Sequence, residues 1–144
     1  MKKTLILCSV LAIAIASTPS ALAANVTTLT VDAVGANELN GGAKNASAKG
    51  TFILNKSKGT ICSSVTTKGL TNIIGSHIHT GVKGVVAEIV VTIDALKINE
   101  VGTSCVKVAP ALLADIAANP SSYYFNVHTK SFPGGAVRGQ LVKK

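Results

Sequence analysis

The sequence predicts an all-β protein: an antiparallel β-sandwich or a flattened Greek-key barrel, with one short helix and one disulfide. Three observations predict this class. Apolar and polar residues alternate over several short segments that are rich in β-branched residues. Turn-forming glycines and prolines separate these segments, and a single stretch has helical character.

The alternating segments predict seven strands, in chain order. They cover residues 26–34, 51–54, 60–68, 73–80, 85–93, 123–129 and 136–142. The intervening stretch 35–50 is rich in asparagine, glycine and alanine, which predicts a long surface loop. Residues 109–118 predict the helix, because Pro110 suits a first helical turn and Asn119-Pro120 ends it.

The first residues have the pattern of a secretory signal peptide. Lys2 and Lys3 precede an apolar run over 5–16, and small residues occupy the positions that signal peptidase reads. We therefore expect a signal peptide over 1–23 and one mature domain over 24–144. The apolar run is shorter than the roughly 20 residues that span a bilayer, so we expect no transmembrane segment and a periplasmic or secreted protein.

The charge pattern excludes one large class of partner. The formal net charge of +8 falls to +6 without Lys2 and Lys3, and the remaining lysines are scattered singly. Nucleic-acid binding favours basic residues clustered with aromatic ones, so we expect no nucleic-acid partner. The spread of lysines favours solubility, with weak attraction to an anionic envelope surface as a lesser effect.

Two of the three cysteines belong to the expected mature domain. Cys8 lies within the apolar run, whereas Cys62 and Cys105 remain after processing. An even number of cysteines in an exported protein predicts a disulfide, which would stabilise the fold by about 4 kcal/mol on the chain-entropy model. The alternative is that both thiolates bind a metal together with the histidines.

All three histidines are predicted to lie on the faces of their strands that point away from the core. In GSHIHTG, alternation places His77 and His79 on one face, opposite Ile74 and Ile78. In the strand 123–129, the inward residues are Tyr123, Phe125 and Val127. The outward residues there are Tyr124, Asn126 and His128.

The last strand adds two polar residues to this outward face. Val137, Gly139 and Leu141 point inward, so Arg138 and Gln140 point outward. If 131–135 is a hairpin turn, Asn126 lies opposite Gln140 or Arg138, and His128 lies opposite Arg138 or Ala136.

The histidines predict a transition-metal site. A His-x-His pair on one strand plus a distant histidine suits copper or zinc and leaves a coordination position open. The ligands would be His77, His79 and His128, and the residues that support them would be Asn126, Arg138 and Gln140. The competing interpretation is that these histidines only form hydrogen bonds with their neighbours.

Several motifs also resemble the CHRD domain, which is named for chordin and found in many exported bacterial proteins. The resemblance is carried by His77-Ile78-His79-Thr80-Gly81, by Gly84, and by residues 119–129 and 132–141. It covers nearly all of the mature chain and implies an extracytoplasmic β domain without implying an activity. In chordin this domain accompanies modules that bind growth factors, so a protein partner in the envelope is a further expectation.

The order of the histidines, a later arginine and one disulfide is also similar to copper-zinc superoxide dismutase. That likeness implies that His77, His79 and His128 are copper ligands and that Arg138 steers an anionic substrate. The bridging histidine and the zinc-binding loop of that family have no counterpart, because the chain has only three histidines. The likeness therefore implies copper binding more than dismutase activity.

Other catalytic patterns are absent from the sequence. Asp32, Asp94 and Asp115 do not accompany a nucleophile elbow, and no glycine-rich loop opens a helix to hold phosphate. We expect a binding protein rather than an enzyme, holding copper or another transition metal. The alternatives are a metal-free interaction or structural module and a copper-only enzyme that resembles superoxide dismutase.

Overall fold

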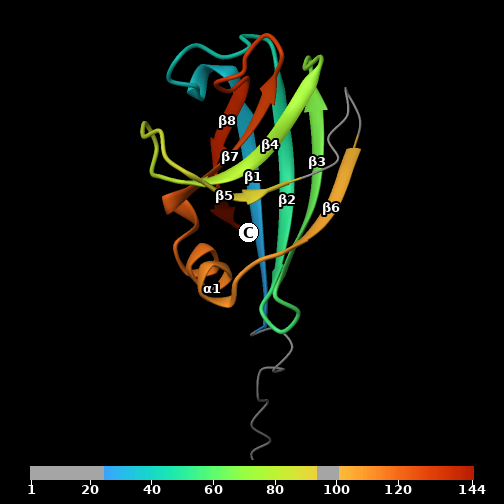
Figure 1. Ribbon diagram of the computed structural model, residues 1–144, viewed down its shortest axis with the longest axis vertical. Coiled ribbons are helices and arrows are strands. Elements are labelled where there is room, and N and C mark those ends of the chain that lie inside the picture. The colour runs from blue at the N-terminus through green and yellow to red at the C-terminus, as the bar shows by residue number, and fades with distance from the viewer. Residues whose placement is uncertain (1–24, 94–100) are drawn as a thin grey trace, which may run out of the picture.

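The computed structural model describes residues 25–93 and 101–144, which form a mostly antiparallel, nearly closed barrel-like sheet (Figure 1). The strands are β1 (Val26–Val34), β2 (Ser47–Asn55), β3 (Thr60–Lys68), β4 (Ile73–Thr80), β5 (Ile89–Thr92), β6 (Val101–Lys107), β7 (Tyr123–Thr129), β8 (Val137–Gln140) and β9 (Val142–Lys143). Their order is β5-β4-β7-β8-β1-β2-β3-β6, and β9 pairs with β1. The predicted fold class is confirmed.

Short helical segments complete the described part of the chain. The α-helix α1 (Pro110–Ala118) begins at the predicted proline and lies at one end of the sheet (Figure 1). The 3-10 turns are η2 (Gly35–Asn37) and η3 (Pro120–Ser122). No helix among the described residues is long and apolar enough to cross a membrane. The predicted signal peptide, 1–23, and Asp94 lie outside these residues.

Four predicted strands, now β1, β3, β4 and β7, have the predicted bounds. β2 begins at Ser47 rather than at residue 51, so the predicted loop over 35–50 is too long. The reason is packing by small residues: Gly50 lies opposite Val31, and a Cβ on Gly50 would lie 3.0 Å from Val31 Cγ1. Small side chains conceal the alternation that marks a strand.

The structure corrects two further predictions and adds one strand. Residues 85–88 belong to a loop, so β5 is shorter than the predicted strand 85–93. The predicted strand 136–142 is divided into β8 and β9. β6 was not predicted, because Gly102, Thr103 and Ser104 give it little apolar alternation.

The predicted disulfide is present and joins β3 to β6. Cys62 lies opposite Cys105 in the register of these two antiparallel strands. The cross-link thus attaches the strand at one end of the sheet order to its neighbour. Both sulfur atoms are occupied in the disulfide, so they are not thiolate ligands as the alternative had them.

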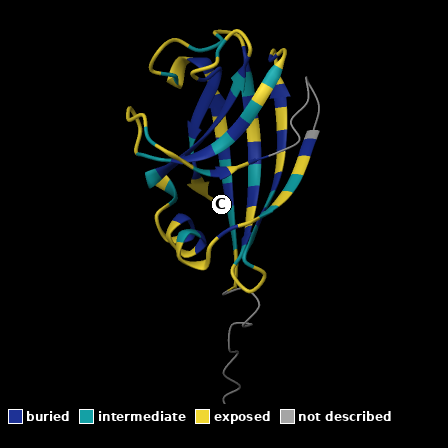
Figure 2. Cartoon of the chain, in the orientation of Figure 1, coloured by how far each residue is buried: buried dark blue, intermediate teal, exposed yellow. Residues whose placement is uncertain are grey.

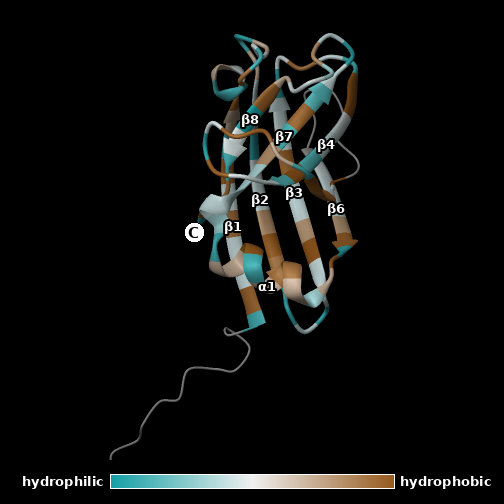
Figure 3. Cartoon of the chain, turned by 60° about the vertical axis from the view of Figure 1, so that its left-hand side comes forward, coloured by the Kyte–Doolittle hydropathy of each residue, from teal (hydrophilic) through white to brown (hydrophobic). Residues whose placement is uncertain are grey.

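The core lies inside the barrel-like sheet. Phe52 and Phe125 pack with their ring centroids 5.3 Å apart. Leu113 and Ile116 of α1 are buried against the same core. Figure 3 shows hydrophobic bands alternating with hydrophilic ones along the strands, as expected for a sheet with one apolar face.

One predicted direction is wrong. Ile78 is fully buried, as expected, but Ile74 is exposed rather than on the core face. The pairing of β4 with β7 shifts register between Ile73 and Gly75, which breaks the alternation before it reaches His77. From Gly75 onward the predicted alternation of β4 is regular.

Candidate metal centre

The neighbouring strands β4 and β7 bring the three histidines together. In their register Gly75 lies opposite His128, His77 opposite Asn126, and His79 opposite Tyr124. One ligand atom from each histidine lies within 4.8 Å of those of the other two. The His77 ring centroid is 5.7 Å from that of His79 and 5.0 Å from that of His128. The segments predicted to meet therefore do meet.

Backbone carbonyls orient two of the imidazoles. Nδ1 of His79 lies 2.9 Å from the carbonyl oxygen of Ala87, and Nδ1 of His128 lies 2.9 Å from that of Pro133. A carbonyl only accepts hydrogen bonds, so Nδ1 carries the proton in both rings and Nε2 of each neutral ring has a lone pair. Both Nε2 atoms are buried without a hydrogen-bond partner, so their lone pairs could coordinate a metal ion.

His77 occupies space that a glycine leaves open. A Cβ on Gly75 would lie 3.2 Å from Cε1 of His77, tighter than an ordinary van der Waals contact. The absence of a side chain at Gly75 therefore lets the His77 ring lie over the strand and close to His128. The structure also buries Nδ1 of His77.

Burial favours the neutral form of His79. The side chain is 7% exposed. Its pKa is lowered chiefly by burial, while the hydrogen bond to Ala87 and the side chain of Asn126 act in the opposite direction. The charge of Arg138 lowers it further, as protonation of His128 would. Metal binding requires a neutral imidazole, so this environment keeps His79 in the form that binds a metal.

Tyr124 and Arg138 form a stack next to His79. The rings of His79 and Tyr124 are parallel within 8° with centroids 4.7 Å apart, and Cζ of Arg138 lies 3.4 Å from the Tyr124 centroid. Nη2 of Arg138 donates to the carbonyl oxygens of Val82 and Val85. The loop 81–88 thus covers this face of the sheet.

This cover corrects the predicted exposure of Arg138. The side chain is 3% exposed, although it points away from the core as alternation requires. Its guanidinium is engaged with loop carbonyls rather than presented to solvent, so its position does not support the steering of anions that the likeness to superoxide dismutase implied. Sequence alternation cannot reveal that a loop covers the outer face of a strand.

Asn126 and Gln140 have different surroundings. Asn126 lies opposite Arg138, one of the two partners predicted for the hairpin, and its Oδ1 is buried. On its other side it lies opposite His77. Gln140 lies opposite Tyr124. Its Nε2 donates to the carbonyl oxygens of Gly81, Ser121 and Tyr123, so it holds the ends of loops rather than a histidine.

Sequence reasoning missed Gly75 and Tyr124 as members of this site. The signal for Tyr124 was present, because alternation placed it on the face that carries His128. No pattern marks the carbonyls of Ala87 and Pro133 as acceptors, since any residue supplies a carbonyl.

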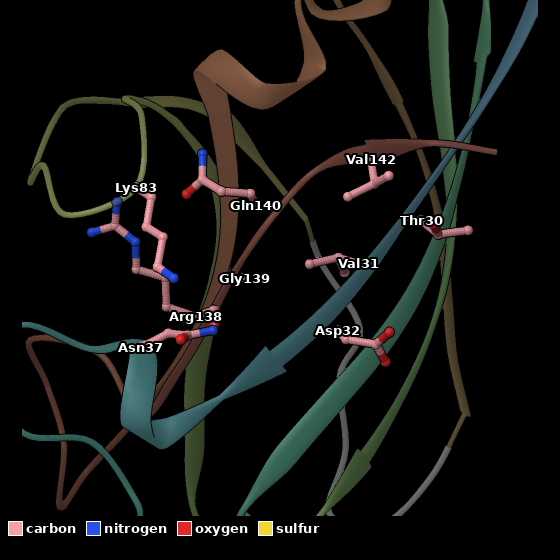
Figure 4. Close-up of a pocket in the computed structure, with 9 residues that line it drawn as sticks. All are labelled: Thr30, Val31, Asp32, Asn37, Lys83, Arg138, Gly139, Gln140 and Val142. Carbon is pink, nitrogen blue, oxygen red and sulfur yellow. The ribbon is translucent and has the colours of Figure 1, made fainter.

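A pocket of about 370 Å³ lies beside Arg138, lined by residues of β1, β8 and β9 together with Asn37 and Lys83 (Figure 4). Its polar side chains are those of Thr30, Asp32, Asn37, Lys83, Arg138 and Gln140. None of the three histidines lines it. The candidate metal centre is therefore the histidine cluster itself and not this pocket.

Comparison with known proteins gives one family. The family model described as CHRD domain matches residues 29–141, which include the three histidines, the disulfide and the stack beside His79. No curated protein and no solved structure gives a match to this sequence.

Proposed function

We propose that this chain, which belongs to the CHRD domain family, is an exported protein that holds one copper ion through His77, His79 and His128. The observation that carries the proposal is the convergence of three histidine ring nitrogens within 4.8 Å of one another. The two carbonyl acceptors of the Nδ1 protons support it, because they leave Nε2 of His79 and His128 as lone-pair donors.

The cluster has suitable dimensions for a first-row transition metal. Nitrogen ligands lie about 2.0–2.1 Å from such an ion, so two of them are at most about 4.2 Å apart. The separations in the cluster, up to 4.8 Å, become compatible with this limit after small rotations of the rings. Two strands already hold the ligands, so little of the binding free energy is spent on ordering them.

The donor set favours copper among the metals of the cell envelope. Among the residues that the structure describes, the cluster consists of imidazoles alone, with no carboxylate or thiolate in it. Imidazole suits copper, zinc, iron and nickel, and divalent copper binds most tightly to a given nitrogen site. Three ligands leave a coordination position open for water or a partner's side chain. Asn126 and Arg138 would support the ligands, and Gln140 would hold the adjoining loops.

Two features support export. Residues 1–23 have the signal-peptide pattern, and the Cys62–Cys105 disulfide is typical of oxidising compartments. The site of action is then the periplasm or the exterior. Isolation of the protein from its native cells would test this: a mature chain beginning near Ala24 in the envelope or medium is expected, and an uncleaved cytosolic chain would refute it.

The copper proposal is tested by titrating the purified mature domain with copper in competition with a chelator. We expect one ion per chain and a loss of stoichiometric binding in His77→Ala, His79→Ala and His128→Ala. Lys56→Gln, an exposed change in the turn after β2, is the matched control and should bind as the wild type does. Copper association no tighter than that of the triple histidine variant would refute the proposal.

A specific observation favours a second candidate function, a metal-free interaction module. The loop 81–88 and the start of β5 expose several large apolar side chains, of which Val86 is 69% exposed. The others are Val82, Val85 and Ile89. Such groups at one edge suit a protein partner in the envelope. A partner recovered equally by wild type and His77→Ala, in the presence of a chelator, would favour this function.

A further inference from the structure

A buried positive charge lies one aromatic ring away from His79. β7 lies between β4 and β8 in the sheet, so His79 and Arg138 approach Tyr124 from neighbouring strands on opposite sides. Tyr124 is stacked on His79 and has the guanidinium of Arg138 3.4 Å from its ring centroid. Two planar groups that close to one ring cannot share a face of it, so the order is Arg138, Tyr124, His79.

The charge of Arg138 is only weakly compensated by its surroundings. Its Nη2 donates to two neutral carbonyls, at 3.2 Å from Val82 and 2.6 Å from Val85. Among the described residues the salt bridge that the structure records joins Lys49 to Asp32, and Arg138 takes part in none. Burial raises the pKa of Glu38 and the charge of Arg138 lowers it, but these two side chains form no ion pair. The side chain is 3% exposed, so solvent screens it little.

The positive charge in this stack would affect how tightly the histidine cluster binds ions of different charge. A fixed positive charge disfavours a divalent ion more than a monovalent one, and the effect grows where water is excluded. A cation on one face of Tyr124 also draws electron density from the ring and from the imidazole stacked on the other face. Both effects weaken His79 as a donor to the more highly charged ion.

We infer that Arg138, acting through Tyr124, is a positioning residue that shifts the histidine cluster towards Cu(I) and away from Cu(II). The inference rests on the proposed copper function and deepens it, because it assigns the oxidation state that the site favours. The quantity concerned is the ratio of the two affinities. The buried charge should change that ratio on the order of 10-fold.

The test measures both affinities of the mature domain. Cu(II) is titrated in air against a Cu(II) chelator, and Cu(I) is titrated anaerobically with ascorbate, a reductant that leaves the disulfide intact, against a Cu(I) chelator. We expect Arg138→Gln to raise the affinity for Cu(II) relative to Cu(I) about 10-fold. Arg138→Lys keeps the charge and should stay within about threefold of wild type, as should the exposed control Lys56→Gln.

A second pair of variants keeps the test valid if Arg138→Gln does not fold. Val85 is exposed and its carbonyl accepts from Arg138, so Val85→Glu adds a negative charge to the residue that the guanidinium binds. It should shift the ratio in the same direction as Arg138→Gln and by less, while the neutral Val85→Gln should not shift it. An unchanged ratio in Arg138→Gln and Val85→Glu, or an equal shift in Arg138→Lys, would overturn the inference alone. Absence of copper binding by wild type would overturn the proposed function with it.

Discussion

The outer face of the sheet is exposed to solvent along β2 and β3 but is largely buried along β7. Along β2 and β3 buried and accessible residues alternate, since one face packs on the core and the other meets solvent. Along β7 six of the seven residues are buried. Figure 2 shows this difference as banded ribbons on β2 and β3 and nearly continuous dark blue along β7 and β8.

The difference shows where the protein buries polar groups away from its core. The outer face of β7 carries Tyr124, Asn126 and His128, and the loop 81–88 covers part of it. Burying polar side chains costs free energy unless they are paired or bind something. The Nε2 atoms of His79 and His128 are buried there without a hydrogen bond, so the covered face, and not the core, is where a bound ligand would lower the free energy.

The largest expected effect tests the core side of this comparison. Phe125→Ala removes a fully buried ring that packs on Phe52, so the free energy of unfolding should fall by about 3–5 kcal/mol. Ile53→Ala, on the solvent face of β2, should cost only about 0.5 kcal/mol. Urea denaturation of both variants without metal measures these changes. An equal loss in the free energy of unfolding for the two variants would show that Ile53 is also packed against other residues rather than exposed to solvent.

The next effect tests the covered face. Copper that binds only the folded state at about 100 times its dissociation constant should raise the free energy of unfolding by about 2.7 kcal/mol. His128→Ala removes a ligand from the outer face of β7 and should abolish the increase. Urea denaturation with copper, followed by excess chelator, measures this. If copper raised the free energy of unfolding of His128→Ala by the same amount, it would be binding at a site other than the histidine cluster.

Local patterning explains what the sequence could predict. Alternation in GSHIHTG and in the strand ending at Thr129 gave the bounds of β4 and β7 and the shared direction of His77, His79 and His128. It also placed Asn126 opposite either Gln140 or Arg138, and the structure has Arg138 there. These features depend on period-2 geometry within a strand and a hairpin, which the residues encode directly.

Long-range contacts explain what it could not predict. The burial of Arg138 depends on loop carbonyls more than 50 positions earlier in the chain, and any residue can supply a carbonyl. β6 depends on pairing with β3 and on the disulfide, because its own residues give a weak pattern. Ile74 is exposed because of a register shift that depends on how β4 meets β7.

A smaller effect is expected at Gly75, where the absence of a side chain leaves room for the ring of His77. Gly75→Ala places a methyl group 3.2 Å from Cε1 of His77 and should weaken copper binding about tenfold. Its backbone is extended, so alanine should not destabilise the metal-free protein. Gly134→Ala is the matched control, because nothing lies within 4 Å of the added Cβ. Chelator competition measures both, and equal affinities in the two variants would remove Gly75 from the site.

The smallest expected effect separates two adjacent tyrosines of β7. The phenol of Tyr123 donates a hydrogen bond to the carboxylate of Asp115 on α1, away from the stacked Tyr124. Burial, followed by this hydrogen bond and the charge of Asp115, raises the pKa of Tyr123 to about 12. The folded state thus holds the phenol proton more tightly than the unfolded state. Its contribution to stability is complete below pH 10, the ordinary pKa, and is lost as the pH rises towards 12.

Asp115, the hydrogen-bond partner of Tyr123, makes stability depend on pH in the opposite direction at low pH. The hydrogen bond from Tyr123, then that from Asn119, lowers the pKa of Asp115, so its contribution is present above 3.8 and is lost as the pH falls further. Tyr123→Phe should flatten the alkaline loss of stability, measured by urea midpoints between pH 7 and 11, and leave copper affinity at pH 7 unchanged. A weakened copper site in Tyr123→Phe would mean that the inner and outer faces of β7 are coupled, contrary to their separation by the strand itself.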